Sequence, residues 1–114
     1  MWQEDVETAL KAVSGISPSF GYPASFAGEK VAVSYRQADQ RVVLSADNAP
    51  YTTVTEIYVD AWNADPSRVA MAAAGVKTAL VGIGFDRVFS QDLYEVNSGL
   101  HHRSERYIRE EDEE

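Results

Sequence analysis

Two adjacent histidines, His101 and His102, are the strongest candidates for chemistry in this sequence, with Asp92 and Glu95 shortly before them. Imidazole and carboxylate groups are common ligands of zinc. Neighbouring residues of a strand point to opposite faces, however, so the two imidazoles are badly placed to share one metal ion. A solvated or interfacial histidine pair is the better interpretation. We therefore predict no metal site and no cofactor.

Two other patterns resemble catalytic motifs only superficially. Ser98 beside Gly99 lacks the base and the orienting acid that a nucleophilic serine needs. The pair Gly82 and Gly84 follows a predicted helix, whereas a phosphate-binding loop precedes one. The chain also has no cysteine, which excludes disulfides and thiol catalysis. We predict that the protein is not an enzyme; a metal-assisted hydrolase built on either histidine is the one enzyme hypothesis that remains.

The segment Tyr51–Trp62 is the clearest predicted strand, because β-branched and aromatic residues dominate it. One face of this strand is suited to a core. The other face mixes two carboxylates with large apolar side chains, namely Val54, Glu56, Tyr58, Asp60 and Trp62. Two interpretations fit that mixture: a protein interface, or a solvent-exposed face with some aromatic cover.

The strand leads into the clearest predicted helix, Pro66–Gly82, with Asp65 as N-cap and an alanine-rich apolar face. A second helix is predicted at Trp2–Ser14 and a loop at Ile16–Lys30. The remaining predicted strands are Val31–Gln37 and Arg41–Ser45, joined as a hairpin by Ala38–Gln40, then Phe85–Ser90 and His102–Arg109, with an irregular link at Gln91–Gly99. The predicted fold is α+β: a mainly antiparallel sheet of four to five strands, with an N-terminal helix and one long helix packed on it.

Composition narrows the class of protein. The chain has 114 residues, 45% of them hydrophobic, which predicts a single domain over residues 1–109. Residues 110–114, EEDEE, are predicted to be an acidic disordered tail, and the formal net charge of −8 makes the chain a poor nucleic-acid binder. Its longest apolar stretch is too polar to span a membrane. The acidic N-terminus is unlike a signal peptide, so we expect a cytoplasmic product.

The phrases TEIYVDAWNADPSRVAMAAAGVKTAL and DLYEVNSGLHHRSERYI, together with the order of predicted elements, resemble the tail terminator (tail completion) proteins of long-tailed phages and prophages. The resemblance covers about Trp2–Arg109 and rests on layout more than on an invariant motif. It implies a structural role: a ring, commonly hexameric, that caps the tail tube and joins it to the head. The implied partners are other copies of the chain, the tail tube protein and a head-completion or connector protein, while DNA passes without specific binding. The implied location is the virion, after assembly in the bacterial host cytoplasm.

Within this resemblance, the residues that we expect at subunit or tube contacts are Tyr58, Trp62, His102, Arg103 and Arg106. Glu56 and Asp60, with the acidic tail, are expected to face a channel, where negative charge lets DNA slide. Two alternatives stay open. One is another head–tail connector or neck protein, and the other is a small bacterial ligand-binding or regulatory domain. Size in solution is the simplest measurement that discriminates between assembly and ligand binding.

Overall fold

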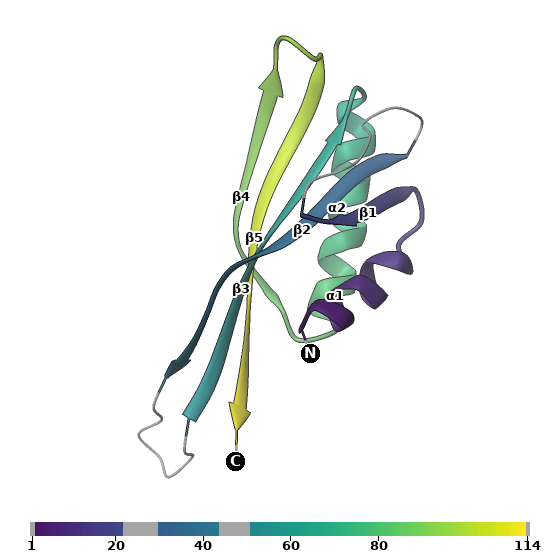
Figure 1. Cartoon of the computed structure of the whole chain (residues 1–114). Helices are drawn as coiled ribbons and strands as arrows, with labels where there is room; N and C mark the ends of the chain where they lie inside the picture. The colour runs from purple at the N-terminus through teal and green to yellow at the C-terminus, as the bar shows by residue number, and fades with distance from the viewer. Residues whose placement is uncertain (1, 22–29, 44–50, 114) are drawn as a thin grey trace.

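The computed structural model describes residues 2–21, 30–43 and 51–113. The elements, in chain order, are α1 (Trp2–Lys11), β1 (Ile16–Phe20), β2 (Val31–Val43), β3 (Tyr51–Asn63), α2 (Pro66–Val81), β4 (Asp86–Glu95) and β5 (Leu100–Glu113). The five strands form one sheet in the order β1-β2-β3-β5-β4, and both helices pack on the same side of it (Figure 1). The predicted α+β class is therefore confirmed.

The sheet is mixed because of its first strand. β1 lies parallel to β2, with Ile16 opposite Val31 and Phe20 opposite Tyr35, whereas every other described pairing is antiparallel. The predicted loop at Ile16–Lys30 is therefore wrong for residues 16–20. Two prolines and two glycines in that stretch favour a loop, but Pro18 is tolerated because β1 is an edge strand.

The predicted hairpin between Val31–Gln37 and Arg41–Ser45 is also wrong. β2 is one strand of 13 residues, and the polar stretch Ala38–Gln40 contains a bulge between Gln37 and Asp39. A bulge absorbs one extra residue without ending the strand, which is why turn-like residues remain inside the ladder. The antiparallel partner of β2 is β3, and residues 44–45 of the prediction lie outside the described residues.

The C-terminal strands are longer than predicted. β4 continues through Gln91–Glu95, so only residues 96–99 of the predicted link form the turn to β5. β5 continues to Glu113, with Glu110 opposite Val54 and Glu113 opposite Tyr51. The expected disordered tail is therefore wrong for residues 110–113, because their main chain pairs with β3 while Glu110 and Glu111 remain exposed. Glu114 lies outside the described residues.

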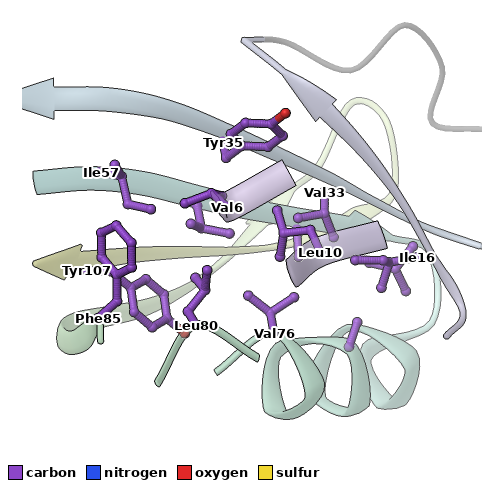
Figure 2. Packing of buried hydrophobic residues seen from close by; sticks show 14 of the residues in the cluster. Val6, Leu10, Ile16, Val33, Tyr35, Ile57, Val76, Leu80, Phe85 and Tyr107 are labelled. Atoms are coloured by element: carbon purple, nitrogen blue, oxygen red, sulfur yellow. The ribbon is translucent and has the colours of Figure 1, made fainter. Parts of the chain in front are cut away.

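The core lies between the helices and the sheet face that they cover (Figure 2). Its largest fully buried side chains are Tyr107, Phe85, Leu10, Ile57, Leu80, Val6, Val33 and Val76. α2 contributes small residues such as Ala72 and Ala73, which let the helix approach the sheet closely. As predicted, Asp65 caps α2: its side-chain oxygen accepts a 2.9 Å hydrogen bond from the Ser67 amide.

The helices are shorter than the sequence suggested. α1 ends at Lys11 rather than Ser14, and α2 has 16 residues and ends at Val81. In the described part of the chain, no helix has the length and apolar character needed to cross a membrane.

Candidate interaction surface

The sheet has a second face, opposite the helices, which we call the uncovered face. Antiparallel register brings one residue from each of four strands into a row across it. Tyr58 on β3 lies between Arg36 on β2 and Arg106 on β5, and Arg106 in turn lies opposite Phe89 on β4. Cations and aromatic rings therefore alternate along this row.

The side chains of the row interact with each other. The guanidinium carbon of Arg36 lies 4.4 Å from the centroid of the Tyr58 ring. The corresponding carbon of Arg106 lies 5.1 Å from the centroid of Tyr58 and 5.7 Å from that of Phe89. Each such cation–π contact contributes about 0.5–1 kcal/mol at an exposed site. The contacts hold the arginines in place on the sheet, so a partner would meet ordered side chains.

A second group on the same face is centred on His102. Its ring stacks on Trp62 with centroids 4.5 Å apart, and its Nε2 lies 2.8 Å from Asp60 Oδ1. Its Nδ1 lies 3.8 Å from Glu95 Oε1. Trp62 is 5% exposed and Asp60 is 8% exposed, so both side chains are held within the subunit. The described residues contain no group of three or more His, Asp or Glu that could hold a metal ion.

Glu56 also lies on the uncovered face and has cationic neighbours. Its Oε1 lies 3.7 Å from Arg106 Nε and its Oε2 lies 4.0 Å from an Arg41 nitrogen. The structure thus brings six predicted residues onto one face: Tyr58, Trp62, His102, Arg106, Glu56 and Asp60.

Arg103 does not belong to this group. It points to the helix-covered side of the sheet, where its Nε donates a 2.7 Å hydrogen bond to Asp92 Oδ1. That bond lowers the pKa of the Asp92 carboxyl and raises the pKa of the Arg103 guanidinium. His101 lies on this side too, with its ring centroid 4.9 Å from that of Tyr94. The two histidines therefore point to opposite faces, as predicted.

Sequence reasoning found only the first half of the exposed strand β4. All ten of its residues are exposed, including Val88, Phe89, Leu93 and Tyr94, and Val96 follows in the turn with 81% of its surface exposed. The sequence prediction assigns half of this strand to an irregular link. The signal that could have found it is the repeated pairing of large apolar residues, at 88–89 and 93–94, inside an otherwise polar segment.

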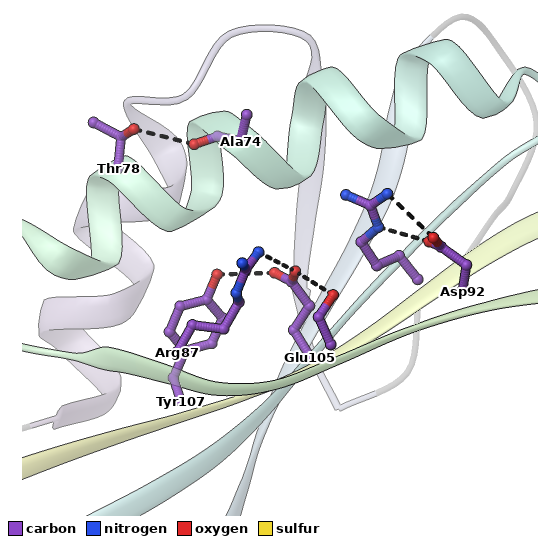
Figure 3. A network of polar contacts seen from close by, with 8 residues as sticks. Ala74, Thr78, Arg87, Asp92, Glu105 and Tyr107 are labelled. Carbon is purple, nitrogen blue, oxygen red and sulfur yellow. Dashed lines mark hydrogen bonds and ion pairs between the residues drawn. The ribbon is translucent and has the colours of Figure 1, made fainter.

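A buried carboxylate fixes β4 to β5 (Figure 3). Glu105, 2% exposed, accepts hydrogen bonds from the hydroxyl of Tyr107 at 2.8 Å, the hydroxyl of Ser90 at 2.9 Å and a guanidinium nitrogen of Arg87 at 3.1 Å. Burial, reinforced by the charge of Glu105, raises the pKa of Tyr107. The network therefore links the exposed strand β4 to β5 through side chains as well as through the main chain.

The fold has a counterpart among solved structures. No protein-family profile matches the sequence, and no curated protein matches it. The fold is shared with a chain of a solved structure described as "Virion of native gene transfer agent (GTA) particle", with a TM-score of 0.66 and 16% sequence identity. The match covers 97% of this chain and 94% of that chain. At this identity the likeness shows a common fold.

Proposed function

We propose that this protein is a structural, non-enzymatic component of a phage-like particle: a tail terminator that forms a ring, caps the tail tube and joins it to the head. The observation that carries the proposal is the fold shared, over nearly all of both chains, with a chain of a gene transfer agent virion. The resemblance of the sequence to tail terminators selects this role from among the components of such a particle.

The surface of the described chain supports assembly. Monomeric proteins seldom leave a long strand with large apolar side chains open at the edge of a sheet. Here β4 does so, and the neighbouring uncovered face carries an ordered row of arginines and aromatic rings. Arginine and aromatic residues are enriched where proteins bind each other. We assign contacts with other subunits or the tube to Tyr58, Arg106 and His102 on this face, with Trp62 supporting His102 from below.

The charge of the uncovered face supports a place beside DNA. Among the side chains that the structure describes, this face carries six carboxylates (Asp39, Glu56, Asp60, Asp86, Glu95, Glu110) and three arginines (Arg36, Arg41, Arg106), a difference of −3. A wall of net negative charge repels phosphates and lets DNA pass without sticking. We therefore keep Glu56 as a channel-facing residue, its charge partly balanced by neighbouring cations, while Asp60, 8% exposed and 2.8 Å from His102, adds its charge from beneath that surface.

Deleting the gene from its source genome and imaging the particles tests the role. A terminator predicts tails of uncontrolled length and heads that remain separate from them. Tails of normal length that fail to join heads would favour another head–tail connector or neck protein. Particles that assemble normally without the protein would overturn the proposal.

A point variant tests the surface. Arg106→Glu reverses a charge in the centre of the cation–aromatic row, and we expect it to prevent tail joining while the protein still folds. Lys77→Glu, on the exposed side of α2, makes the same charge change away from the row and serves as control. If the Arg106→Glu protein supports normal joining, this assignment of the surface is wrong.

A further inference from the structure

The two edges of the sheet have opposite properties. β4, at one edge, has ten exposed residues, and Glu105 and the ion pair between Asp92 and Arg103 hold it in place. β1, at the other edge, has five residues and no charge. The sheet thus presents one long acidic edge with apolar side chains and one short neutral edge.

β4 is an edge with only part of the usual protection. Its sequence, DRVFSQDLYE, has four charged residues and a bulge between Arg87 and Phe89, but it contains neither proline nor lysine. Its exposed apolar side chains project to both sides of the sheet, with Phe89 and Leu93 on the uncovered face and Tyr94 on the other. Such an edge can bind a partner by its main chain and its side chains together.

The charges of β4 argue against pairing with a second β4. The strand carries Asp86, Asp92 and Glu95 against one cation, Arg87, a difference of −2. A two-fold contact between two β4 strands would place a net charge of −2 beside another net charge of −2. Like charges on adjacent strands are destabilising. The partner of β4 should instead be neutral or basic, with apolar side chains of its own.

The β1 side of the molecule has that character. Phe20 is 53% exposed at the end of β1, and Met71 on α2 is 76% exposed. A cavity of about 380 Å³ opens beside the start of β1, lined by Lys30, Arg68 and Met71 among others. Two cations, of which Arg68 already pairs with Asp65 at 3.7 Å, and two apolar side chains therefore lie along the edge opposite to β4.

We propose that β4 of one copy docks against the β1 side of a second copy, so that subunits associate head to tail. This inference rests on the proposed function, which requires self-association, and adds which surfaces meet. β1 runs parallel to β2, and three antiparallel pairings separate β2 from β4, so β4 and β1 run in opposite directions. A rotation about an axis along the strands then places β4 beside β1 in antiparallel orientation. Repetition of one such heterologous contact closes a ring when the rotation divides a full turn.

Pro18 limits how this contact forms. The Val31 amide donates to the Gly15 carbonyl and the Gly21 amide donates to the Tyr35 carbonyl, so residues 15, 17, 19 and 21 face β2 and Pro18 faces the open edge. Because proline has no N–H, a continuous ladder cannot form there. Side chains must therefore carry much of the contact, and the rotation between the two copies decides whether the ring closes.

Cross-linking tests the arrangement, and the absence of native cysteine makes each introduced thiol unique. Ser17→Cys lies on β1 and Gln91→Cys on β4, both at exposed positions. With a short bismaleimide, we expect a mixture of the two variants to give a cross-linked dimer and the double variant to give a ladder of larger species. Each variant alone should remain a single chain. A dimer from Gln91→Cys alone, or no cross-link in the mixture at the highest soluble concentration, would overturn the proposal.

A second variant tests the chemistry of the contact. Leu93→Lys removes an apolar side chain from β4 and replaces it with a strongly hydrated one, and we expect it to lower the cross-linking yield by at least about tenfold. Val81→Lys, at a comparably exposed apolar residue of α2, should leave the yield unchanged. If the edges fail to cross-link but gene deletion still separates heads from tails, only the edge assignment fails. If the edges cross-link but deletion has no effect, self-association holds and the proposed function fails.

Discussion

At the scale of single residues, Glu105 is a buried carboxylate that accepts hydrogen bonds from three side chains. Glu105→Gln keeps the size of the side chain but removes the charge that Arg87 pairs with, and it replaces one acceptor oxygen by a donor. We expect a loss of about 2–3 kcal/mol in the free energy of unfolding, less than for a fully buried pair because Arg87 is part-exposed. Urea denaturation measures the loss.

The control for this variant lies on the same strand. Glu110→Gln changes an exposed carboxylate of β5 and should shift the free energy of unfolding by no more than about 0.5 kcal/mol. Equal effects of the two substitutions would show that Glu105 contributes no more than a surface charge does.

The buried hydroxyl of Tyr107 makes the free energy of unfolding fall as the pH rises above about 10. Because its pKa is raised in the folded protein, the unfolded chain loses this proton first, from about pH 10 upward. The unfolded state then binds fewer protons than the folded state, so stability falls as pH rises. We expect Tyr107→Phe to reduce this fall by about 1.4 kcal/mol per pH unit above about pH 10, measured by urea denaturation across that range. Tyr94→Phe, at an exposed tyrosine, should leave the slope as in the wild type; an unchanged slope in Tyr107→Phe would contradict the argument.

At the scale of elements, the approach of the turn after α1 to helix α2 depends on Gly75. A Cβ atom at this position would lie 3.0 Å from Cγ1 of Val13. Gly75→Ala gains about 1 kcal/mol of helix propensity, but the tight contact offsets much of that gain. In a Val13→Ala background the contact is absent, so we expect the same substitution to stabilise the protein by the full amount. Thermal or urea unfolding of the four proteins in this cycle measures the coupling, and additive effects would show that this turn can move away from α2 without cost.

The elements that the sequence predicted well are those whose signals are local. β3 has a run of β-branched residues and α2 has an N-cap followed by proline, so both are located to within a residue or two. β1 and the second half of β4 carry loop-like residues, and only their pairing with β2 and β5 makes them strands. Long-range pairing of this kind leaves no trace in a single segment.

The candidate surface was predictable for a related reason. Alternation along β3 indicated that Glu56, Tyr58, Asp60 and Trp62 share a face, and the structure confirms it. Arg103, also expected at a contact, lies on the other face, because β5 alternates as well and turns Arg103 toward Asp92. The partners Arg36 and Phe89 could not be identified in advance, since they depend on register across four strands.

At the scale of the whole molecule, the sheet is longer than the helix layer that covers it. The principal extents are 51 × 26 × 21 Å, and the ends of β2 and β5 with the start of β3 project beyond both helices as a three-stranded arm (Figure 1). Arg109 lies at the boundary: it bonds to Asp5 of α1 at 3.2 Å and to Glu111 at 2.6 Å, and its guanidinium carbon lies 4.9 Å from the ring centroid of Phe85.

The three-stranded arm and the helix-covered part of the sheet should therefore respond differently to removal of the C-terminal residues. Ending the chain after Arg109 removes the strand opposite residues 51–54 but leaves the core intact. We expect amide exchange at residues 52–54 to accelerate by roughly fivefold or more, since each lost ladder bond is worth about 1 kcal/mol, while Val33 and Val59 stay protected. Hydrogen exchange read by NMR or mass spectrometry measures both regions. Glu110→Gln with Glu111→Gln, which keeps the main-chain pairing, should exchange like the wild type. Acceleration in that control as large as in the truncated chain would mean that charge, and not strand pairing, orders the arm.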